Sequence, residues 1–366
     1  MASTSSKILR VVRQRPLTSV GLTATVSGLS YASWVEHQAT RQERRYWKSL
    51  ELEGDNKTTL SAPPLLPRVY SWDALHEYWS IRPMTTLGRL LEIGGSLSPL
   101  MVRHLWDFKV SPLLLEDNTE NANSDDKKEL MRQHAAEWRH VLTRLGPAFV
   151  KAGQQLSIRP DLVPPVVLEE LQKLCDSVQP VPDEIAMAVL EQELGQKPDD
   201  LFDNLRLVAS ASLGQVYKGT LKNSNNKEEV AVKIQRPGMV QAFSLDLFLL
   251  QCWGIFMDSW TSVVTHQKPY HKDFLQNFAK GGYGELDYEL EANNQKHFQH
   301  EMDIRGCQVV IPDVHDDYTT RRVLTTQWID GIRLSDAPPE TIRRLIPIGV
   351  ELFLCQLLDI GAFHGE

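Results

Sequence analysis

Cysteine is scarce in this chain: its 366 residues contain only Cys175, Cys252, Cys307 and Cys355, and no two of them form a CxxC pair. Such wide spacing disfavours a disulfide framework and a zinc site, and it favours a reducing compartment. An excess of positive charge is also absent, because the formal net charge is −8. Nucleic acid is therefore not expected as a partner.

Long uninterrupted apolar stretches are missing from the centre of the chain. The apolar run 247–257 is bounded by Asp246 and Asp258 and is only eleven residues long. A bilayer needs about 20 apolar residues, so this run predicts a buried helix.

The start of the chain lacks acidic residues. None precedes Glu36, whereas four basic residues lie among many Ser and Thr: Lys7, Arg10, Arg13 and Arg15. This composition predicts an organelle transit segment over residues 1–35, with a disordered basic tail as the alternative. Residues 17–35 could span a bilayer by length but are diluted by Ser, Thr and Gly, so a single span is the weaker interpretation. Residues 36–71, charged and then Pro-rich, are expected to form a linker.

Residues 72–195 have the pattern of a helical extension. Apolar residues recur at helical spacing up to about residue 115, and an acidic, Asn-rich loop follows at 116–129. A helix is expected from about 128 to 144, then a break at Gly146-Pro147 and a second helix carrying the letters KAGQ.

The pattern then changes to β-formers. Two such runs, separated by the polar letters NSNNK, predict a hairpin that ends near residue 235. Further expectations are helices at 240–262, 271–302 and 341–359 and strands at 308–312 and 322–329. This order predicts an α+β fold: a protein-kinase-like N-lobe over 196–330 and the start of a mostly helical C-lobe over 331–366.

Several side chains fit phosphoryl transfer, which needs clamped phosphates more than covalent help. Lys233 ends the letters VAVK on a predicted strand, where a lysine can pair with nucleotide phosphates. The small-residue loop before it could admit phosphates to backbone N–H groups, although an ordinary tight turn is the alternative. Its residues are Ala209, Ser210, Ala211, Ser212, Gly214 and Gln215.

Two further groups carry charge on predicted helices. Lys151, Gly153 and Gln154 belong to the letters KAGQ, and Lys151 and Gln154 share a helix face. Glu285, Asp287 and Glu291 follow later and could pair with Lys233 or Lys151, although most such carboxylates only solvate a helix face. His297 and His300 could bind a metal ion, but a solvated helix face is the better interpretation.

Together these segments resemble the UbiB (aarF-domain) atypical kinases, also called the ABC-one family, over roughly residues 72–366. The resemblance rests on six segments: YWSIRP at 78–83, LGPAFVKAGQQLSIRPDLVPP at 145–165, the alanine-rich loop at 209–217, VAVKIQRPG at 230–238, ELDYELEAN at 285–293 and VLTTQWIDG at 323–331. It implies an atypical kinase or ATPase that binds ATP with Mg²⁺ and supports isoprenoid-quinone metabolism, either ubiquinone or plastid prenylquinone, at a membrane surface.

The resemblance also implies roles for individual residues. Lys233 would pair with phosphates and with Glu291, and the loop from Ala209 to Gln215 would cradle the nucleotide. The hinge beside the adenine would be Gln327, Trp328 and Ile329. The KxGQ residues Lys151, Gly153 and Gln154 would lie over the substrate cleft, and Glu285 and Asp287 would meet the KxGQ lysine.

Two departures from the family stand out. Ser210 replaces an alanine of the loop, and Glu366 stands where the catalytic aspartate is expected, after Phe363, His364 and Gly365. No metal-binding residue is assigned, because the family's magnesium ligands would follow residue 366. We therefore expect the chain to be a fragment that is inactive alone and whose helix at 341–359 exposes an apolar face.

Alternative functions remain open from sequence. The chain could be a non-catalytic pseudokinase or regulatory module, or a scaffold tethered to a membrane through residues 17–35. Expected partners are ATP, a lipid or quinone precursor, an organelle membrane surface and quinone-biosynthesis proteins. The Arg-rich start favours the mitochondrion, and YWSIRP gives the plastid as the alternative.

Overall fold

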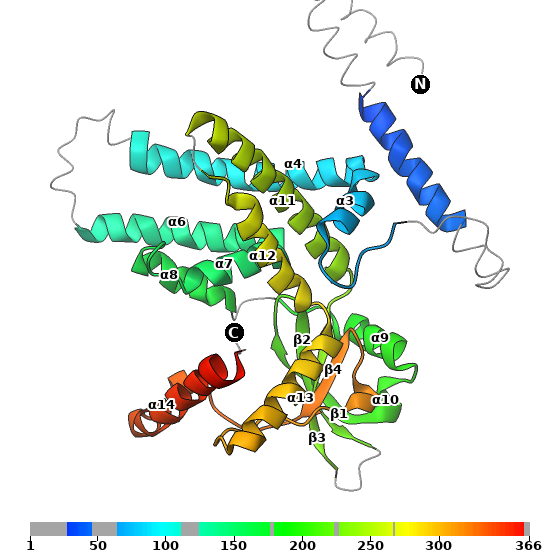
Figure 1. Cartoon of the computed structure of the whole chain (residues 1–366), viewed down its shortest axis with the longest axis vertical. Coiled ribbons are helices and arrows are strands. Elements are labelled where there is room, and N and C mark those ends of the chain that lie inside the picture. The colour runs from blue at the N-terminus through cyan, green and yellow to red at the C-terminus, as the bar shows by residue number, and fades with distance from the viewer. Residues whose placement is uncertain are drawn as a thin grey trace, which may run out of the picture. The chain divides into compact units, whose positions relative to one another are not determined.

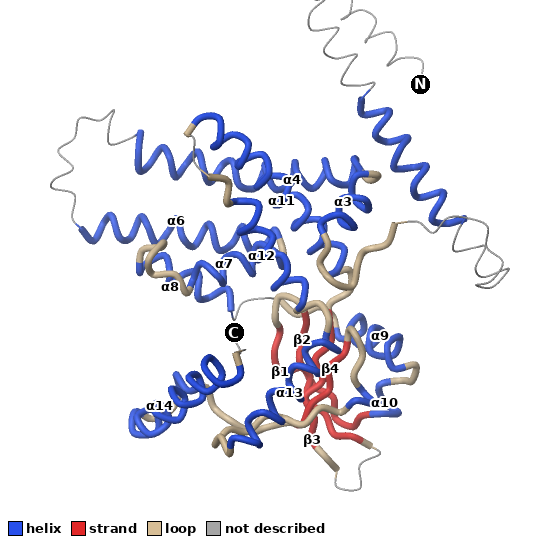
Figure 2. The backbone as a smooth tube through the Cα atoms, viewed as in Figure 1, coloured by secondary structure: helices blue, strands red, loops and turns tan. Residues whose placement is uncertain are grey.

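The computed structural model of the chain describes residues 28–45, 64–110, 124–175, 179–222, 227–265 and 268–361 (Figure 1). These residues fall into two compact units. The helical unit is Met1–Leu171 with Val240–Lys280, and the sheet unit is Gln172–Met239 with Gly281–Glu366. All four strands belong to the sheet unit (Figure 2).

The helical unit is built from a helix over residues 28–45, α3 (Trp72–Ser80), α4 (Pro83–Leu105), a π-helical turn (Trp106–Val110), α6 (Ser124–Leu145), α7 (Pro147–Ser157), α8 (Pro165–Gln172), α11 (Met239–Val264) and most of α12 (His271–Gly284). The predicted break between α6 and α7 is confirmed. Gly146 has a φ of 103°, which a side chain would disfavour, and Pro147 opens α7. Val141, Leu145 and Phe149 are buried there against apolar side chains of α4.

The first described segment of the chain, residues 28–45, is a helix. It covers the end of the predicted transit segment and the start of the predicted linker, and both assignments stay predictions. The Glu36 carboxylate accepts hydrogen bonds from the backbone N–H groups of Met84 (2.7 Å) and Thr85 (3.1 Å) at the start of α4. Glu43 pairs with Arg82, the residue that precedes α4. Acidic groups at a helix N-terminus are stabilising, so this segment is held by α4. Of the remaining predicted transit and linker residues, 64–71 form neither helix nor strand, and the others lie outside the described parts.

α11 is partly buried and carries two acidic residues. It is also the one described helix long and apolar enough to cross a membrane by length and composition alone, with 44% of its most apolar window buried. The Asp246 carboxylate, fully buried, accepts hydrogen bonds from the Arg89 guanidinium of α4 at 2.7 and 2.9 Å. Trp72 of α3 stacks on Phe248 at 5.7 Å between ring centroids. The buried helix expected over 247–257 is therefore confirmed only in part, because Trp253 in this run is 53% exposed.

The second acidic residue of α11 joins it to α12. Asp258 accepts hydrogen bonds from the backbone N–H groups of Tyr270 (3.0 Å), His271 (2.9 Å) and Lys272 (2.8 Å). Burial raises the pKa of Asp258, but these bonds and one from the His271 ring outweigh burial and lower the pKa to about 2. The aspartate therefore caps the start of α12 from another helix.

The sheet unit contains α9 (Asp183–Leu194), α10 (Pro198–Leu201), β1 (Phe202–Ser210), β2 (Gly214–Leu221), β3 (Glu229–Gln235), α13 (Tyr288–Arg305), β4 (Val323–Gln327), α14 (Pro339–Leu354) and a π-helical turn (Cys355–Ile360). The strands form one antiparallel sheet in the order β1-β2-β3-β4. The predicted hairpin is β2–β3, and the predicted α+β class is confirmed.

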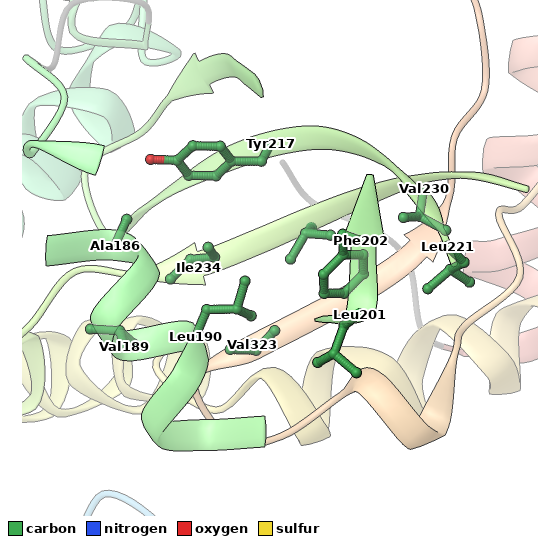
Figure 3. Packing of buried hydrophobic residues seen from close by; sticks show 11 residues of the cluster. Ala186, Val189, Leu190, Leu201, Phe202, Tyr217, Leu221, Val230, Ile234 and Val323 are labelled. Carbon is green, nitrogen blue, oxygen red and sulfur yellow. The ribbon is translucent and has the colours of Figure 1, made fainter. Parts of the chain in front are cut away.

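One face of the sheet packs on α9. Ala186, Val189 and Leu190 of the helix meet inward-facing side chains of the strands (Figure 3). The strand residues of this core are Phe202, Tyr217, Leu221, Val230, Val232, Ile234 and Val323. On α13, Tyr288 and Ala292 pack against Leu324 of β4. Because successive strand residues alternate between faces, Val323 and Leu324 serve different helices.

Two expectations about the end of this unit have different outcomes. The strand predicted at 308–312 is wrong: no strand forms there, and the isolated bridge to β4, between Val314 and Thr326, lies just beyond it. Pro312 has no backbone N–H to donate to a ladder, which disfavours a strand at this point. The predicted exposed face of the helix at 341–359 is confirmed, since α14 buries no residue and Ile346, Val350 and Phe353 are each at least 50% exposed.

The Arg89–Asp246 pair gives a first prediction. Arg89→Ala leaves a buried carboxylate without its cation, so we expect the free energy of unfolding to fall by about 3–5 kcal/mol in a urea titration. The double variant Arg89→Met with Asp246→Leu buries no charge and should lose much less. Equal losses in the two variants would contradict this account.

The Asp258 cap gives a second prediction, on pH. A carboxylate whose pKa is lowered on folding stabilises the protein above its unfolded value, about 4, and this stabilisation is lost as the pH falls toward 2. Asp258→Ala should therefore melt at a lower temperature than the wild type at pH 6, with the difference shrinking toward pH 2. Asp273→Ala serves as control and should change the melting temperature much less, because Asp273 is exposed in the first turn of α12, the helix that Asp258 caps. A difference for Asp258→Ala that is constant between pH 6 and pH 2 would rule out this role.

Candidate functional site

Strand alternation aims Lys233 at α13. Val232 and Ile234, its neighbours on β3, point into the α9 core. Lys233 therefore projects from the opposite face, where its strand partners are Val216 of β2 and Leu324 of β4. Because Leu324 packs on α13, the lysine and that helix share one face of the sheet.

Glu291 receives the lysine. The Lys233 ammonium donates to both oxygens of the Glu291 carboxylate, at 2.7 and 2.8 Å. It also lies 4.6 Å from the ring centroid of the buried Tyr288, a cation–π contact. The two charged side chains are 31% and 38% exposed, so a ligand can reach them. The expected lysine–glutamate pair is thus present in the structure.

The first turn of α13 fixes Glu291. Asp287 is the N-cap of this helix, and its side chain accepts from the Leu290 N–H at 3.3 Å. The Gln235 side chain of β3 donates to the Leu286 carbonyl at 2.9 Å, and the Tyr288 N–H donates to the Arg321 carbonyl at 3.0 Å. These bonds tie the start of α13 to the end of β3 and to the segment just before β4.

The small-residue loop is the β1–β2 turn. Ala209 and Ser210 end β1, Gly214 and Gln215 begin β2, and the Ala211 N–H donates to the Gly214 carbonyl at 2.8 Å. A Cβ added to Gly214 would lie 2.5 Å from the Tyr288 hydroxyl and 2.7 Å from the Ile234 carbonyl oxygen. Only glycine fits there, which brings the turn close to the Lys233 side of the sheet.

Arg236 anchors this loop and was not among the expected site residues. Its guanidinium donates to the Ala211 carbonyl (3.1 Å), the Gln179 carbonyl (2.7 Å) and the Ser210 hydroxyl (2.7 Å). Ser210, which departs from the family pattern, thus accepts a hydrogen bond that an alanine side chain could not accept. Although Arg236 lies in the segment VAVKIQRPG, the sequence did not show which groups its side chain would bind.

The Gln215 side chain has a structural partner. It is 1% exposed and exchanges hydrogen bonds with the Val181 backbone at 2.9 and 3.2 Å. It also donates to the Tyr217 hydroxyl, which in turn donates to Asp183 at 2.7 Å. Burial, followed by the bond to Asp183, raises the pKa of Tyr217. The glutamine side chain therefore supports the sheet beneath the loop.

The expected hinge lies at the end of β4. The Gln327 N–H donates to the Asp313 carbonyl at 2.8 Å, and the Trp328 N–H donates to the Glu229 carbonyl at 2.9 Å. The Lys218 ammonium lies 4.7 Å from the centroid of the Trp328 ring. Ile329 follows and is 41% exposed. These contacts hold the hinge beside β3, the strand that carries Lys233.

Comparison with known proteins shows the family of this chain. Residues 173–366, just over half of the chain, match the ABC1 atypical kinase-like domain. The chain belongs to the ABC1 atypical kinase-like family. The matched region contains Lys233, Glu291 and the small-residue loop.

Relatives of known name support the assignment. Protein ACTIVITY OF BC1 COMPLEX KINASE 3, chloroplastic, from Arabidopsis thaliana is 35% identical over 305 residues, which cover 81% of this chain and 40% of the relative. An uncharacterized protein of Synechocystis is 35% identical over 306 residues, covering 81% and 42%. ACTIVITY OF BC1 COMPLEX KINASE 1, chloroplastic, from Arabidopsis is 33% identical over 293 residues, covering 78% and 42%. The chain thus spans about two fifths of the length of these relatives.

The names correct one expectation. The Arg-rich start favoured the mitochondrion, but the Arabidopsis relatives are described as chloroplastic. The finding supports the plastid alternative and gives no support to the mitochondrion. Basic, Ser-rich composition is shared by transit segments of both organelles, so it could not decide between them.

The ABC1 motif residues outside the nucleotide loop fall in both units. Lys151, Gly153 and Gln154 lie on α7 of the helical unit. Glu285 and Asp287 lie in the sheet unit, at the junction of α12 and α13. The helix expected across 271–302 is wrong at this junction, because it is interrupted where Asp287 caps α13. The contact between the two motifs stays a prediction.

Metal-binding residues are not found in the described parts of the chain. Within them, no group of three or more His, Cys, Asp or Glu side chains could hold a metal ion. His297 and His300 both lie on α13 and belong to no such group. Glu366, expected at the catalytic aspartate position, lies outside the described residues.

Gly214 gives a third prediction. Gly214→Ala places a methyl group against a backbone carbonyl and a buried tyrosine hydroxyl, so we expect it to lower the free energy of unfolding by about 1–3 kcal/mol. The measurement is a urea titration followed by circular dichroism. Gly331→Ala is the matched control, because its Cβ would meet nothing within 4 Å. An equal effect of the two substitutions would show that the close approach at Gly214 is not a constraint.

Proposed function

We propose that this chain binds ATP at the sheet unit, as the nucleotide-binding half of an ABC1 atypical kinase or ATPase. The observation that carries the proposal is the pair of Lys233 and Glu291, beside a turn whose Gly214 admits no side chain. Kinases use a strand lysine, held by a helix glutamate, to fix the phosphates of ATP. Family membership supports the same use here.

Each group has a distinct part in the proposed complex. Glu291 holds the Lys233 ammonium in place, so that the cation needs no reordering when phosphates arrive. Backbone N–H groups of Ser212 and Leu213 in the turn would approach the phosphates, and Arg236 keeps this turn in position. Gln327, Trp328 and Ile329 would border the adenine at the end of β4.

Magnesium would accompany the nucleotide, where it would neutralise phosphate charge. No described residue is assigned to it, because the described parts contain no suitable cluster of ligands. The proposal therefore concerns the side chains and backbone N–H groups that would bind the nucleotide, and not the metal ion.

We extend the proposal to the whole protein by family. The chain spans about two fifths of the length of these relatives, whose names include a kinase activity and a chloroplast location. We propose that the complete protein acts in a plastid, at a membrane surface, in isoprenoid-quinone metabolism. Its further partners would be a lipid or quinone precursor and quinone-biosynthesis proteins.

A non-catalytic nucleotide sensor is the second candidate. Glu366 favours it, because glutamate is one methylene longer than the aspartate expected there and would misplace the carboxylate. Nucleotide binding without hydrolysis by the complete protein would favour the sensor, and hydrolysis lost with Lys233 would favour the kinase or ATPase.

Nucleotide affinity tests the proposed site. Lys233→Ala removes a charge-assisted contact worth about 1.5–3 kcal/mol, so we expect ATP to bind at least about tenfold more weakly in a calorimetric titration. Lys296→Ala is the matched control. Lys296 is another ion-paired lysine of the sheet unit, 2.8 Å from Asp316, and its removal should change the affinity by less than about twofold.

A folding defect must be separated from a binding defect. Circular dichroism of each variant should match the wild type before titration. Unchanged ATP affinity in a folded Lys233→Ala protein, or equal losses in both lysine variants, would overturn the proposed site.

A further inference from the structure

Two cysteines that are far apart in sequence meet in the sheet unit. The Sγ atoms of Cys307 and Cys355 lie 4.0 Å apart, although 48 positions separate the residues. Both thiols are free and partly buried. The wide spacing that argued against a disulfide framework therefore conceals a close pair.

Each sulfur sits at the end of a helix. α13 ends at Gly306, whose φ of 63° reverses the chain, and the Cys307 N–H then donates to the Met302 carbonyl at 3.1 Å. Cys355 lies where α14 passes into its π-helical turn. One thiol is thus tied to the end of α13 and the other to the end of α14.

The two sulfurs lie within non-bonded contact distance of each other. An S–S bond is about 2.0 Å long, so the sulfurs must approach by about 2 Å. Rotation about the two Cα–Cβ bonds can bring the sulfurs closer, and neither thiol is fully buried.

We propose that Cys307 and Cys355 form a redox-active dithiol that closes to a disulfide and fixes the end of α13 to α14. The oxidant belongs to the class of small or protein disulfides, such as oxidised glutathione or an oxidised dithiol oxidoreductase. This modification site lies outside the proposed nucleotide site and does not depend on it.

Thiol–disulfide exchange would form the bond in two steps. One cysteine loses its proton, and its thiolate attacks a sulfur of the oxidant, which forms a mixed disulfide and releases one thiolate. The second cysteine then loses its proton and attacks the first cysteine's sulfur, which forms the Cys307–Cys355 bond and releases the second thiolate. The oxidant's disulfide takes up two electrons, and the two protons meet the two released thiolates. A dithiol reductant reverses both steps.

The consequence falls on the helix that carries Glu291. The glutamate lies in the first turn of α13, and Cys307 follows its last turn. A covalent tie at the far end limits how far this helix can move relative to α14. It also reduces the number of conformations that the unfolded chain can adopt between the two cysteines.

Peptide mapping of the wild-type chain tests the bond directly. We expect incubation with oxidised glutathione, followed by alkylation and non-reducing tryptic digestion, to join the peptide 306–321 to the peptide 345–366. Each of these peptides contains one cysteine. The joined mass should be about 2 Da below the sum of the two peptides and should disappear after treatment with dithiothreitol.

Variants and hydrogen exchange complete the test. Cys307→Ser and Cys355→Ser should each abolish the joined peptide, whereas the control Cys252→Ser should retain it. Amide exchange in the last turns of α13 should slow several-fold on oxidation of the wild type and stay unchanged in Cys307→Ser. Separate glutathione adducts on the two cysteines, a cross-link through Cys175, or equal exchange in the two redox states would overturn the proposal.

Discussion

The contact between Lys233 and Glu291 organises the sheet unit. It joins residues 58 positions apart, and both members are about a third exposed. A pair this exposed contributes at most about 1 kcal/mol to stability, so its importance lies in position. It can form only because β3 turns its apolar residues to α9 and its lysine to α13, and because Asp287 begins α13 one turn before the glutamate. The nucleotide proposal depends on this arrangement.

Close approach of backbone to side chain is the second constraint on the site. The turn between β1 and β2 carries Ala and Ser where a phosphate loop usually carries several glycines, yet Gly214 remains. Its neighbours, the Tyr288 hydroxyl and the Ile234 carbonyl, explain that position, because any Cβ would collide with them. The other loop residues keep their side chains, and Ser210 uses its own to bind Arg236. The loop is held by side chains as well as by its backbone.

Charge at buried positions shapes the helical unit. Asp246 and Asp258 bound the apolar run of α11, and both are satisfied: one by the Arg89 guanidinium, the other by three backbone N–H groups at the start of α12. Burying a carboxylate is costly unless it is hydrogen-bonded, so these partners let a very apolar helix carry acidic residues inside the unit. Asp246 and Asp258, which limit the apolar run of the sequence to eleven residues, therefore bind α4 and α12 in the structure.

The sequence by itself determined the elements with strong local patterns. The β2–β3 hairpin, α7 after Gly146-Pro147, α11 and α14 follow from periodicity and from glycine and proline. Six segments together, including KAGQ and VAVK, pointed to the ABC1 family. Only the tertiary structure decided which distant groups meet: Glu36 with α4, Arg236 with Ser210, and Cys307 with Cys355. It also decided that 308–312 is no strand and that Asp287 is a cap. The physical reason is that local patterns report the conformation of one segment, whereas these contacts depend on how separate segments pack.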